Sequence, residues 1–183
     1  MITRSRRFRV PIKSIQIQKN SPWTIISTTF KDEYVENVKK TKISKCIFNP
    51  DKKRLQADLS ISQPIIQHIL DSIKEYLQGR SIGPIVLLCS LEGCKKQRFH
   101  WDYDPNLVQD EKPLGVLVAL DDDTKFYTLE KKIELQRGDI LIFDGDLIHA
   151  GGDYESDNYR IHIYLETDYK CRDHNKTYYF LNG

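Results

Sequence analysis

The sequence predicts a mainly β fold of the α+β class, in which a jelly roll or cupin-like barrel follows N-terminal supporting helices. After Gly83, short β-rich runs follow one another, separated by turns such as Gly138-Asp139 and Gly145-Asp146. Before Gly83, the clearest pattern is that of one amphipathic helix. The β-rich runs leave no room between them for the helices that a parallel α/β sheet requires. An antiparallel barrel is therefore expected.

The clearest helix is expected from about Pro64 to Gln78. Its apolar residues recur at helical spacing and fall on one face, and they are Ile65, Ile66, Ile69, Leu70, Ile73, Tyr76 and Leu77. Ser62 can cap its start and Gly79 can end it. Residues 31–40 form a weaker helix candidate, and residues 14–18 alternate as a short strand would.

The β-rich runs that follow this helix are the expected strands of the barrel. They are Ile85–Leu91, Leu114–Leu120, Lys125–Leu129, Lys132–Leu135, Ile140–Phe143 and Arg160–Glu166, with Lys176–Leu181 as a final candidate. A chain of 183 residues has the size of one domain. We expect a single domain with a support region at residues 1–83, the barrel core at 84–167 and a C-terminal extension at 168–183.

Composition and charge place the chain among globular, water-soluble proteins. Hydrophobic residues make up 39% of the chain and charged residues 30%, and the formal net charge is +2. No apolar stretch approaches the roughly 18 residues of a transmembrane helix, and no apolar segment follows the N-terminus as in a secretory signal. The cysteines form no C-x-x-C pair, and they are Cys46, Cys89, Cys94 and Cys171. We expect a cytoplasmic protein with reduced thiols and no membrane contact.

Basic residues gather at the N-terminus, where the chain carries Arg4, Arg6, Arg7, Arg9 and Lys13. Such an arm can dock on phosphates or on acidic protein surfaces, which makes nucleic acid a partner to consider. The simpler interpretation is a frayed and solvated chain end.

A His-x-Asp motif, His100 and Asp102, is the first candidate metal-binding element. At a strand end, residues two apart point to the same side, so one imidazole and one carboxylate can meet a single metal ion. A second histidine, His149, follows 47 residues after Asp102, beyond the strand that begins at the Gly138-Asp139 turn. In a barrel, 47 residues are enough for the chain to pass around and bring His149 opposite His100 and Asp102. Two histidines and one carboxylate on one face form the facial triad of non-haem Fe(II) sites.

Arg160 is the third element, 11 residues after His149 on a predicted strand. A guanidinium grips a carboxylate through two parallel, charge-assisted hydrogen bonds. A dicarboxylate that chelates iron through its keto-acid end needs such a partner for its far end. Strand alternation places His162 on the same side of the strand as Arg160.

These elements, in this order and spacing, resemble the Fe(II)/2-oxoglutarate-dependent oxygenase superfamily, and the step from His149 to Arg160 is most similar to its phytanoyl-CoA-hydroxylase-like branch. The resemblance covers roughly residues 84–167. It implies a double-stranded β-helix in which His100, Asp102 and His149 bind Fe(II) and Arg160 binds the distal carboxylate of 2-oxoglutarate. It also implies O₂ as a cosubstrate. The reaction would decarboxylate 2-oxoglutarate to succinate and CO₂ while a substrate C–H is hydroxylated.

Two further residues are candidates for the surroundings of the cosubstrate. His162 is expected to hydrogen-bond the cosubstrate or substrate near iron, unless it is a packed histidine of the barrel. Tyr127, on a strand expected to approach the cosubstrate, is a candidate hydrogen-bond donor to 2-oxoglutarate, unless it is a core tyrosine. The aspartate at position 102 implies oxygenation, because related halogenases carry a small residue there.

The expected substrate is a polypeptide side chain or a small molecule, and the sequence does not identify it. The alkylated-nucleic-acid demethylases of the superfamily carry a second arginine shortly after the first, whereas the next arginine here is Arg172, beyond the strand. A nucleic-acid-modifying oxygenase that uses the basic arm stays an alternative. A catalytically silent, metal-binding β-barrel is the other.

Overall fold

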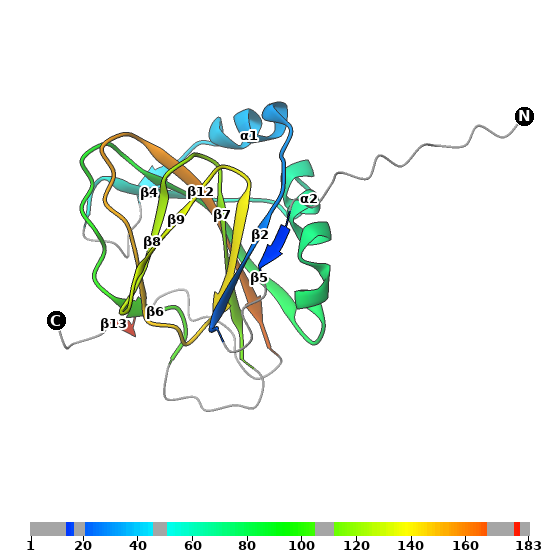
Figure 1. The fold of residues 1–183 in the computed structure, drawn as a ribbon. Helices are drawn as coiled ribbons and strands as arrows, with labels where there is room; N and C mark the ends of the chain where they lie inside the picture. Colours follow the sequence, from blue (N-terminus) through cyan, green and yellow to red (C-terminus); the bar gives the residue numbers. More distant parts are fainter. Residues whose placement is uncertain (1–13, 17–20, 46–50, 105–111, 168–177, 180–183) are drawn as a thin grey trace, which may run out of the picture.

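Two antiparallel sheets make up the body of the computed structural model, which describes residues 14–16, 21–45, 51–104, 112–167 and 178–179 (Figure 1). The larger sheet has the spatial order β1 (Ser14–Gln16), β2 (Trp23–Ser27), β10 (Asp139–Asp144), β7 (Leu114–Ala119), β12 (Asn158–Glu166), β5 (Ser81–Ser90), β4 (Arg54–Asp58) and β3 (Ser44–Lys45). The smaller sheet has the order β13 (Tyr178–Tyr179), β6 (His100–Trp101), β11 (His149–Gly151), β8 (Thr124–Thr128) and β9 (Lys132–Leu135). The predicted mainly β fold is confirmed.

The outer face of the larger sheet packs against the helices α1 (Asp32–Lys39) and α2 (Pro64–Ser72), and this layer is the main core. Alternation along β5 turns Ile85 and Leu87 toward the helices, whereas Val86 belongs to a separate cluster on the other face. The apolar face of α2 is fully used in this layer, through Ile65, Ile66, Ile69 and Leu70. Figure 1 shows α2 on the outside of the sheet, on the opposite side of the molecule from β8 and β9.

A second apolar cluster fills part of the space between the two sheets. Its members come from β7, β8, β9 and β10, and they are Leu117, Ala119, Phe126, Ile133, Leu135, Leu141 and Phe143. Beside this cluster, toward β12, β5 and β4, the space between the sheets is a cavity of about 1040 Å³. The inner face of the larger sheet is therefore apolar at one end and lined by polar side chains at the other.

The long helix expected over residues 64–78 is divided. Helix α2 ends at Ser72, Ile73 leaves the helical conformation at φ −109° and ψ 17°, and a 3₁₀ helix, η1 (Lys74–Leu77), follows. Ser62 does not cap the helix, because Gln63 is the N-cap residue and the Ser62 hydroxyl pairs with Ser60. Pro64 explains this start, since a residue before proline is driven into the extended region and Pro is favoured at the first helical position.

The first 83 residues supply the expected supporting helices and also strands: β1 falls within the strand candidate at residues 14–18, whereas β2, β3 and β4 were not expected. Strand β2 pairs with β10, and β4 pairs with β5, so both belong to the larger sheet. Strand β5 itself begins at Ser81, before the expected start of the barrel. The support region and the barrel are thus one continuous sheet, and β4 brings its own side chains to the cavity.

No helix in the described part of the chain is both long enough and apolar enough to cross a membrane.

Candidate metal centre and its cavity

The two histidines of the predicted triad face each other across a strand pair. His149 of β11 is the register partner of His100 of β6, and their ring centroids are 4.5 Å apart. Asp102, two residues after His100, turns its carboxylate to the same side. The ligand atoms of these three residues all lie within 4.8 Å of one another. The structure therefore brings His100, Asp102 and His149 together as the sequence predicts.

Both imidazoles are oriented by the backbone. His100 Nδ1 lies 2.9 Å from the carbonyl oxygen of Arg98, and His149 Nδ1 lies 2.9 Å from that of Leu147. A carbonyl oxygen only accepts hydrogen bonds, so each Nδ1 carries the hydrogen and donates it. Nε2 of each histidine is then the ring nitrogen that can bind a metal ion, which is how metal-binding histidines are usually held.

Aromatic rings form the wall behind His149. The Phe126 ring stacks on the imidazole at 5.0 Å between centroids with an interplanar angle of 11°, and the Phe143 ring meets it edge-on at 4.9 Å. Both phenylalanines are buried, and so is His149. This packing fixes the imidazole plane and keeps water from its outer side. Two imidazoles and one carboxylate on one face suit a divalent iron ion and leave coordination positions open.

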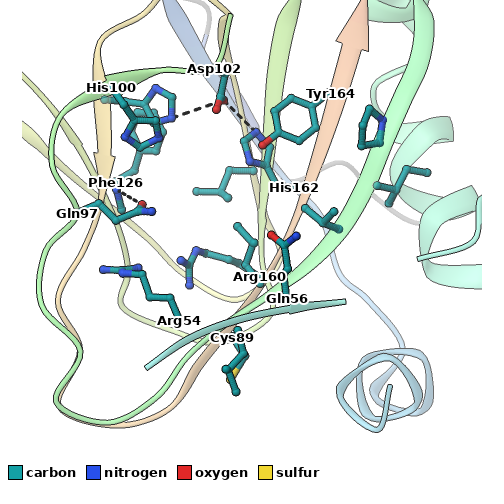
Figure 2. Close-up of a pocket in the computed structure, with 18 of the residues that line it drawn as sticks. Arg54, Gln56, Cys89, Gln97, His100, Asp102, Phe126, Arg160, His162 and Tyr164 are labelled. Atoms are coloured by element: carbon teal, nitrogen blue, oxygen red, sulfur yellow. Dashed lines mark hydrogen bonds and ion pairs between the residues drawn. The ribbon is translucent and has the colours of Figure 1, made fainter. Parts of the chain in front are cut away.

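His162 lies beside the triad on the opposite sheet. Its Nε2 is 3.5 Å from Asp102 Oδ2, and His149 Nε2 is 3.6 Å from the same oxygen. In Figure 2, Asp102 lies between His162 and His100, while Arg160 and Arg54 lie further along the same cavity. His162 is 6% exposed and packs on Tyr164, with ring centroids 4.2 Å apart. The structure thus places His162 against the carboxylate of Asp102, a candidate metal ligand.

Arg160 lines the cavity from β12, two residues before His162. The side chain is buried, and its Nη1 donates a hydrogen bond to Ser90 Oγ at 3.0 Å. Within the described residues, no aspartate or glutamate pairs with this guanidinium. A buried cation without an acidic partner is costly, and an anionic ligand removes that cost. The predicted carboxylate-binding arginine therefore lies where it can bind a carboxylate in the cavity.

Tyr127 does not reach the cavity. Its hydroxyl donates to Asp153 Oδ1 at 3.3 Å in an exposed position, and Lys96 Nζ lies over its ring. The side chain of β8 that lines the cavity is Phe126, one residue earlier. Because strand side chains alternate, a strand that turns Phe126 inward turns Tyr127 outward.

Sequence reasoning did not identify two residues that line the cavity, Arg54 and Gln97. Gln97 Oε1 accepts a hydrogen bond from Gly151 N at 2.9 Å, which ties the segment before His100 to the strand of His149. A side chain at Gly151 would collide with this amide, because a Cβ would lie 2.4 Å from Gln97 Oε1. Arg54 follows two lysines, a pattern typical of a solvated surface, and carries no sequence signal of burial.

The expected C-terminal strand is present as β13, which pairs with β6 so that Tyr179 is opposite His100. Tyr179 lines the mouth of the cavity and is 39% exposed. The basic arm at residues 1–13 lies outside the described residues.

No protein-family model and no curated protein matches this sequence. Solved structures match by fold. HygX from Streptomyces hygroscopicus, crystallised with nickel and 2-oxoglutarate bound, is similar with a TM-score of 0.61 and 12% identity, over 81% of this chain and 84% of that one. The viral collagen prolyl hydroxylase of Paramecium Bursaria Chlorella virus-1, in its 2-oxoglutarate complex, is similar with a TM-score of 0.61 and 13% identity, over 80% of this chain and 96% of that one. A prolyl hydroxylase from Trichoplax adhaerens is similar with a TM-score of 0.60 and 13% identity, over 80% of this chain and 84% of that one.

The chain therefore has the fold of the 2-oxoglutarate-dependent oxygenases, as the resemblance of its motifs implies. At the place where that resemblance requires metal ligands, it holds a His-Asp-His cluster.

Proposed function

We propose that this protein is an Fe(II)- and 2-oxoglutarate-dependent oxygenase that hydroxylates a C–H bond of its substrate. One observation carries the proposal. A single cavity holds a His-Asp-His cluster on the smaller sheet and, on the larger sheet, a buried arginine without an acidic partner among the described residues. A metal chelator with a free carboxylate at its far end could bind the metal ion at the cluster and pair with the arginine at the same time. 2-Oxoglutarate is such a ligand.

In this proposal, one group of residues binds the metal ion and another binds the cosubstrate. His100 and His149 would bind the ion through Nε2, since Nδ1 of each is engaged by a backbone carbonyl. Asp102 would add a carboxylate oxygen and its negative charge. When bound, Fe(II) supplies the O₂-dependent chemistry by which 2-oxoglutarate becomes succinate and CO₂ and one oxygen atom enters the substrate.

Arg160 would fix the far carboxylate of 2-oxoglutarate and so set the orientation of its keto-acid end. Charge-assisted hydrogen bonds from a guanidinium are the strong, directional contacts suited to this task. The apolar side chains of Leu117, Phe126 and Phe143 line the same cavity and exclude water from the region between the arginine and the triad. A dry site strengthens these polar contacts and limits side reactions.

The volume of the cavity leaves room for a substrate beside the cosubstrate. At about 1040 Å³ it is at the upper end of ligand pockets, which measure about 300–1000 Å³. Neighbours with this fold bind substrates of two kinds, since HygX was crystallised with hygromycin B and the Trichoplax adhaerens hydroxylase with a peptide fragment. We infer that the substrate here is a small molecule or a polypeptide side chain. The described residues offer no observation that favours nucleic acid.

Anaerobic titration of the apoprotein with Fe(II) and then 2-oxoglutarate tests the proposal. The iron chelate of a 2-oxo acid gives a visible charge-transfer band, which is expected with the wild type and absent in His149→Ala. His68→Gln is the matched control, because His68 lies on α2, hydrogen-bonded to Thr28 outside the cavity. This variant should keep the full band.

Conversion of 2-oxoglutarate to succinate under air completes the test. Succinate formed by the wild type and by His68→Gln, but not by His149→Ala, is the expected result. A folded protein that gives no band would overturn the metal and cosubstrate assignment. A band without succinate under any substrate screened would favour the catalytically silent barrel.

A further inference from the structure

The strands that carry the two candidate metal-binding histidines are joined by a very short ladder. Among the described residues, β6 and β11 pair at one position, where His100 is opposite His149. Strand β11 is also held by β8 through three register pairs, and β6 is held on its other side by β13 through two. The separation of the two imidazoles therefore depends on what holds the segment before His100 against the segment after His149.

Gln97 joins these two segments by taking the place of a neighbouring strand residue. Its backbone N–H donates to Gly151 O at 3.0 Å, and its side-chain Oε1 accepts from Gly151 N at 2.9 Å. Further from the histidines, Gly93 N donates to Tyr154 O at 2.7 Å. The chain before His100 thus stays alongside the chain after β11, beyond the one ladder pair.

Arg54 holds the same two segments from the other sheet. Its Nη2 donates to Lys95 O and to Gly152 O, both at 2.5 Å. Lys95 lies five residues before His100, and Gly152 lies three residues after His149. This nitrogen of the planar guanidinium carries two hydrogens, one for each carbonyl oxygen. A single nitrogen atom of Arg54 therefore links the two segments.

The guanidinium of Arg54 is itself fixed on the larger sheet. Its Nη1 donates to Ser90 Oγ of β5 at 3.0 Å, and Asp51 Oδ2 lies 3.7 Å from its Nε. The same Asp51 oxygen accepts a hydrogen bond from Lys95 N at 3.3 Å. Arg54 is 4% exposed, and Figure 2 shows its side chain reaching from β4 toward Gln97. The larger sheet thus supports both of the segments that carry the histidines.

We propose that Arg54 and Gln97 form a clamp that sets the separation of His100 and His149, and that both are positioning residues of the metal centre. Neither needs to contact the metal ion, because each acts through backbone groups of the segments that carry the histidines. Groups that orient metal ligands change metal affinity about 10- to 100-fold. The inference rests on the proposed function, because it takes the two histidines as iron ligands.

A purely structural role of Arg54 predicts a different result. Loss of a buried, hydrogen-bonded guanidinium lowers Tm in either case. A structural role leaves the Fe(II) affinity of the folded protein unchanged, whereas loss of the clamp lowers it. Charge acts in the opposite direction, because removal of a cation near the metal centre favours the binding of Fe(II). A lower Fe(II) affinity in Arg54→Gln therefore reports a change in geometry.

The test measures Fe(II) affinity anaerobically by calorimetry, at a temperature where circular dichroism shows each variant to be folded. In Arg54→Gln and in Gln97→Leu, we expect the dissociation constant of Fe(II) to rise about 10- to 100-fold. Arg54→Lys keeps the charge and a nitrogen that can donate to the carbonyl oxygens, so it should lose less affinity, and it provides the measurement if Arg54→Gln does not fold. Co(II) in place of Fe(II) gives visible ligand-field bands, which should shift in both clamp variants because the angles between the ligands change.

Ile66→Val is the matched control for lost stability. Ile66 is 0% exposed on α2, in the layer that covers the outer face of the larger sheet. Removal of one methyl group there should lower Tm by about 1–6 °C, and the Fe(II) affinity and the Co(II) bands should match those of the wild type. Clamp variants that behave like this control, with a lower Tm and unchanged metal binding, would overturn the inference.

Failure of this inference is distinguishable from failure of the proposed function. A wild type that binds Fe(II) with the expected dependence on Arg54 and Gln97, but gives no visible band with 2-oxoglutarate, supports the clamp and contradicts the oxygenase. A wild type that forms the band, together with clamp variants that bind Fe(II) as tightly, contradicts the clamp alone. A folded wild type that binds neither Fe(II) nor Co(II) overturns both.

Discussion

Replacement of Gly115 by alanine tests whether the packing of Phe143 behind the candidate metal centre controls the affinity of that centre for Fe(II). Gly115 of β7 is the register partner of Phe143 of β10, and a Cβ at this position would lie 2.3 Å from Phe143 Cζ. Carbon atoms in unstrained contact lie about 3.5–4.0 Å apart, so the ring has to move by about 1 Å or more. Phe143 is 1% exposed, and its ring centroid lies 4.9 Å from that of His149. The displaced ring therefore presses on His149, a candidate metal ligand.

The expected size of the effect follows from this geometry. Forcing one extra methyl group into a packed core costs about 1–3 kcal/mol. For a chain of 183 residues, each 1 kcal/mol lowers Tm by about 2–4 °C, so Tm in the presence of a chelator should fall by about 2–12 °C. Rotation of His149 should weaken Fe(II) binding about 10- to 100-fold, as loss of the groups that orient a metal ligand does. Circular dichroism and calorimetry measure the two quantities.

Gly83→Ala is the matched control on the neighbouring part of the same sheet. A Cβ at Gly83 would lie 2.7 Å from Glu166 Cδ, the end of a flexible side chain that can turn away. Both Tm and Fe(II) affinity should stay close to those of the wild type. Reduced Tm with unchanged Fe(II) affinity in Gly115→Ala would show that Phe143 does not position His149. Equal losses in the two alanine variants would refute the steric reasoning altogether.

Three further outcomes are expected. Arg160→Ala should raise the dissociation constant of 2-oxoglutarate about 100-fold while Fe(II) binding is kept, because a charge-assisted pair is lost, and calorimetry with each ligand checks it. Fe(II) at about 100 times its dissociation constant should stabilise the apoprotein by about 2.7 kcal/mol, and a chelator should reverse the resulting rise in Tm of about 5–10 °C; an unchanged Tm would argue against the site. Tyr127→Phe should leave 2-oxoglutarate affinity unchanged in the same calorimetric assay, because its hydroxyl pairs with Asp153 outside the cavity.

The pairing of His100 with Asp102 and that of Arg160 with His162 were predictable because spacing along a strand encodes the side to which a residue points. Asp102 has to share a side with His100 at a strand end, and Arg160 has to share a side with His162 on a strand. Tyr127 shows the limit of such reasoning. The expected strand, Lys125–Leu129, lies one residue later than β8 (Thr124–Thr128), and a choice between neighbouring residues decides which side chain faces inward. Phe126 and Tyr127 are both ordinary strand residues, so propensity does not separate them.

Strand β4 was not predictable from its own sequence. Its residues Arg54, Gln56 and Asp58 alternate on one face, as in any strand, but they are polar because they face a cavity and not a core. Sequence reasoning recognises a half-buried strand by apolar residues at every second position, and a strand that lines a polar cavity reverses this signal. For the same reason the sequence did not indicate that Arg54 is buried. Its hydrogen bonds go to Ser90 and to the carbonyl oxygens of Lys95 and Gly152, which lie 41 and 98 residues away in sequence.

The two halves of the candidate site belong to different sheets. His100 and His149 come from strands of the smaller sheet, and Arg160 and Arg54 come from strands of the larger one. A ligand that chelates at the triad and reaches the arginines therefore joins the sheets, and its length has to match the distance between them. The side chains that set this distance are those packed between the sheets, above all Phe126 and Phe143, whose ring centroids are 4.8 Å apart. The same two rings pack on His149, so the packing between the sheets also orients this candidate metal ligand.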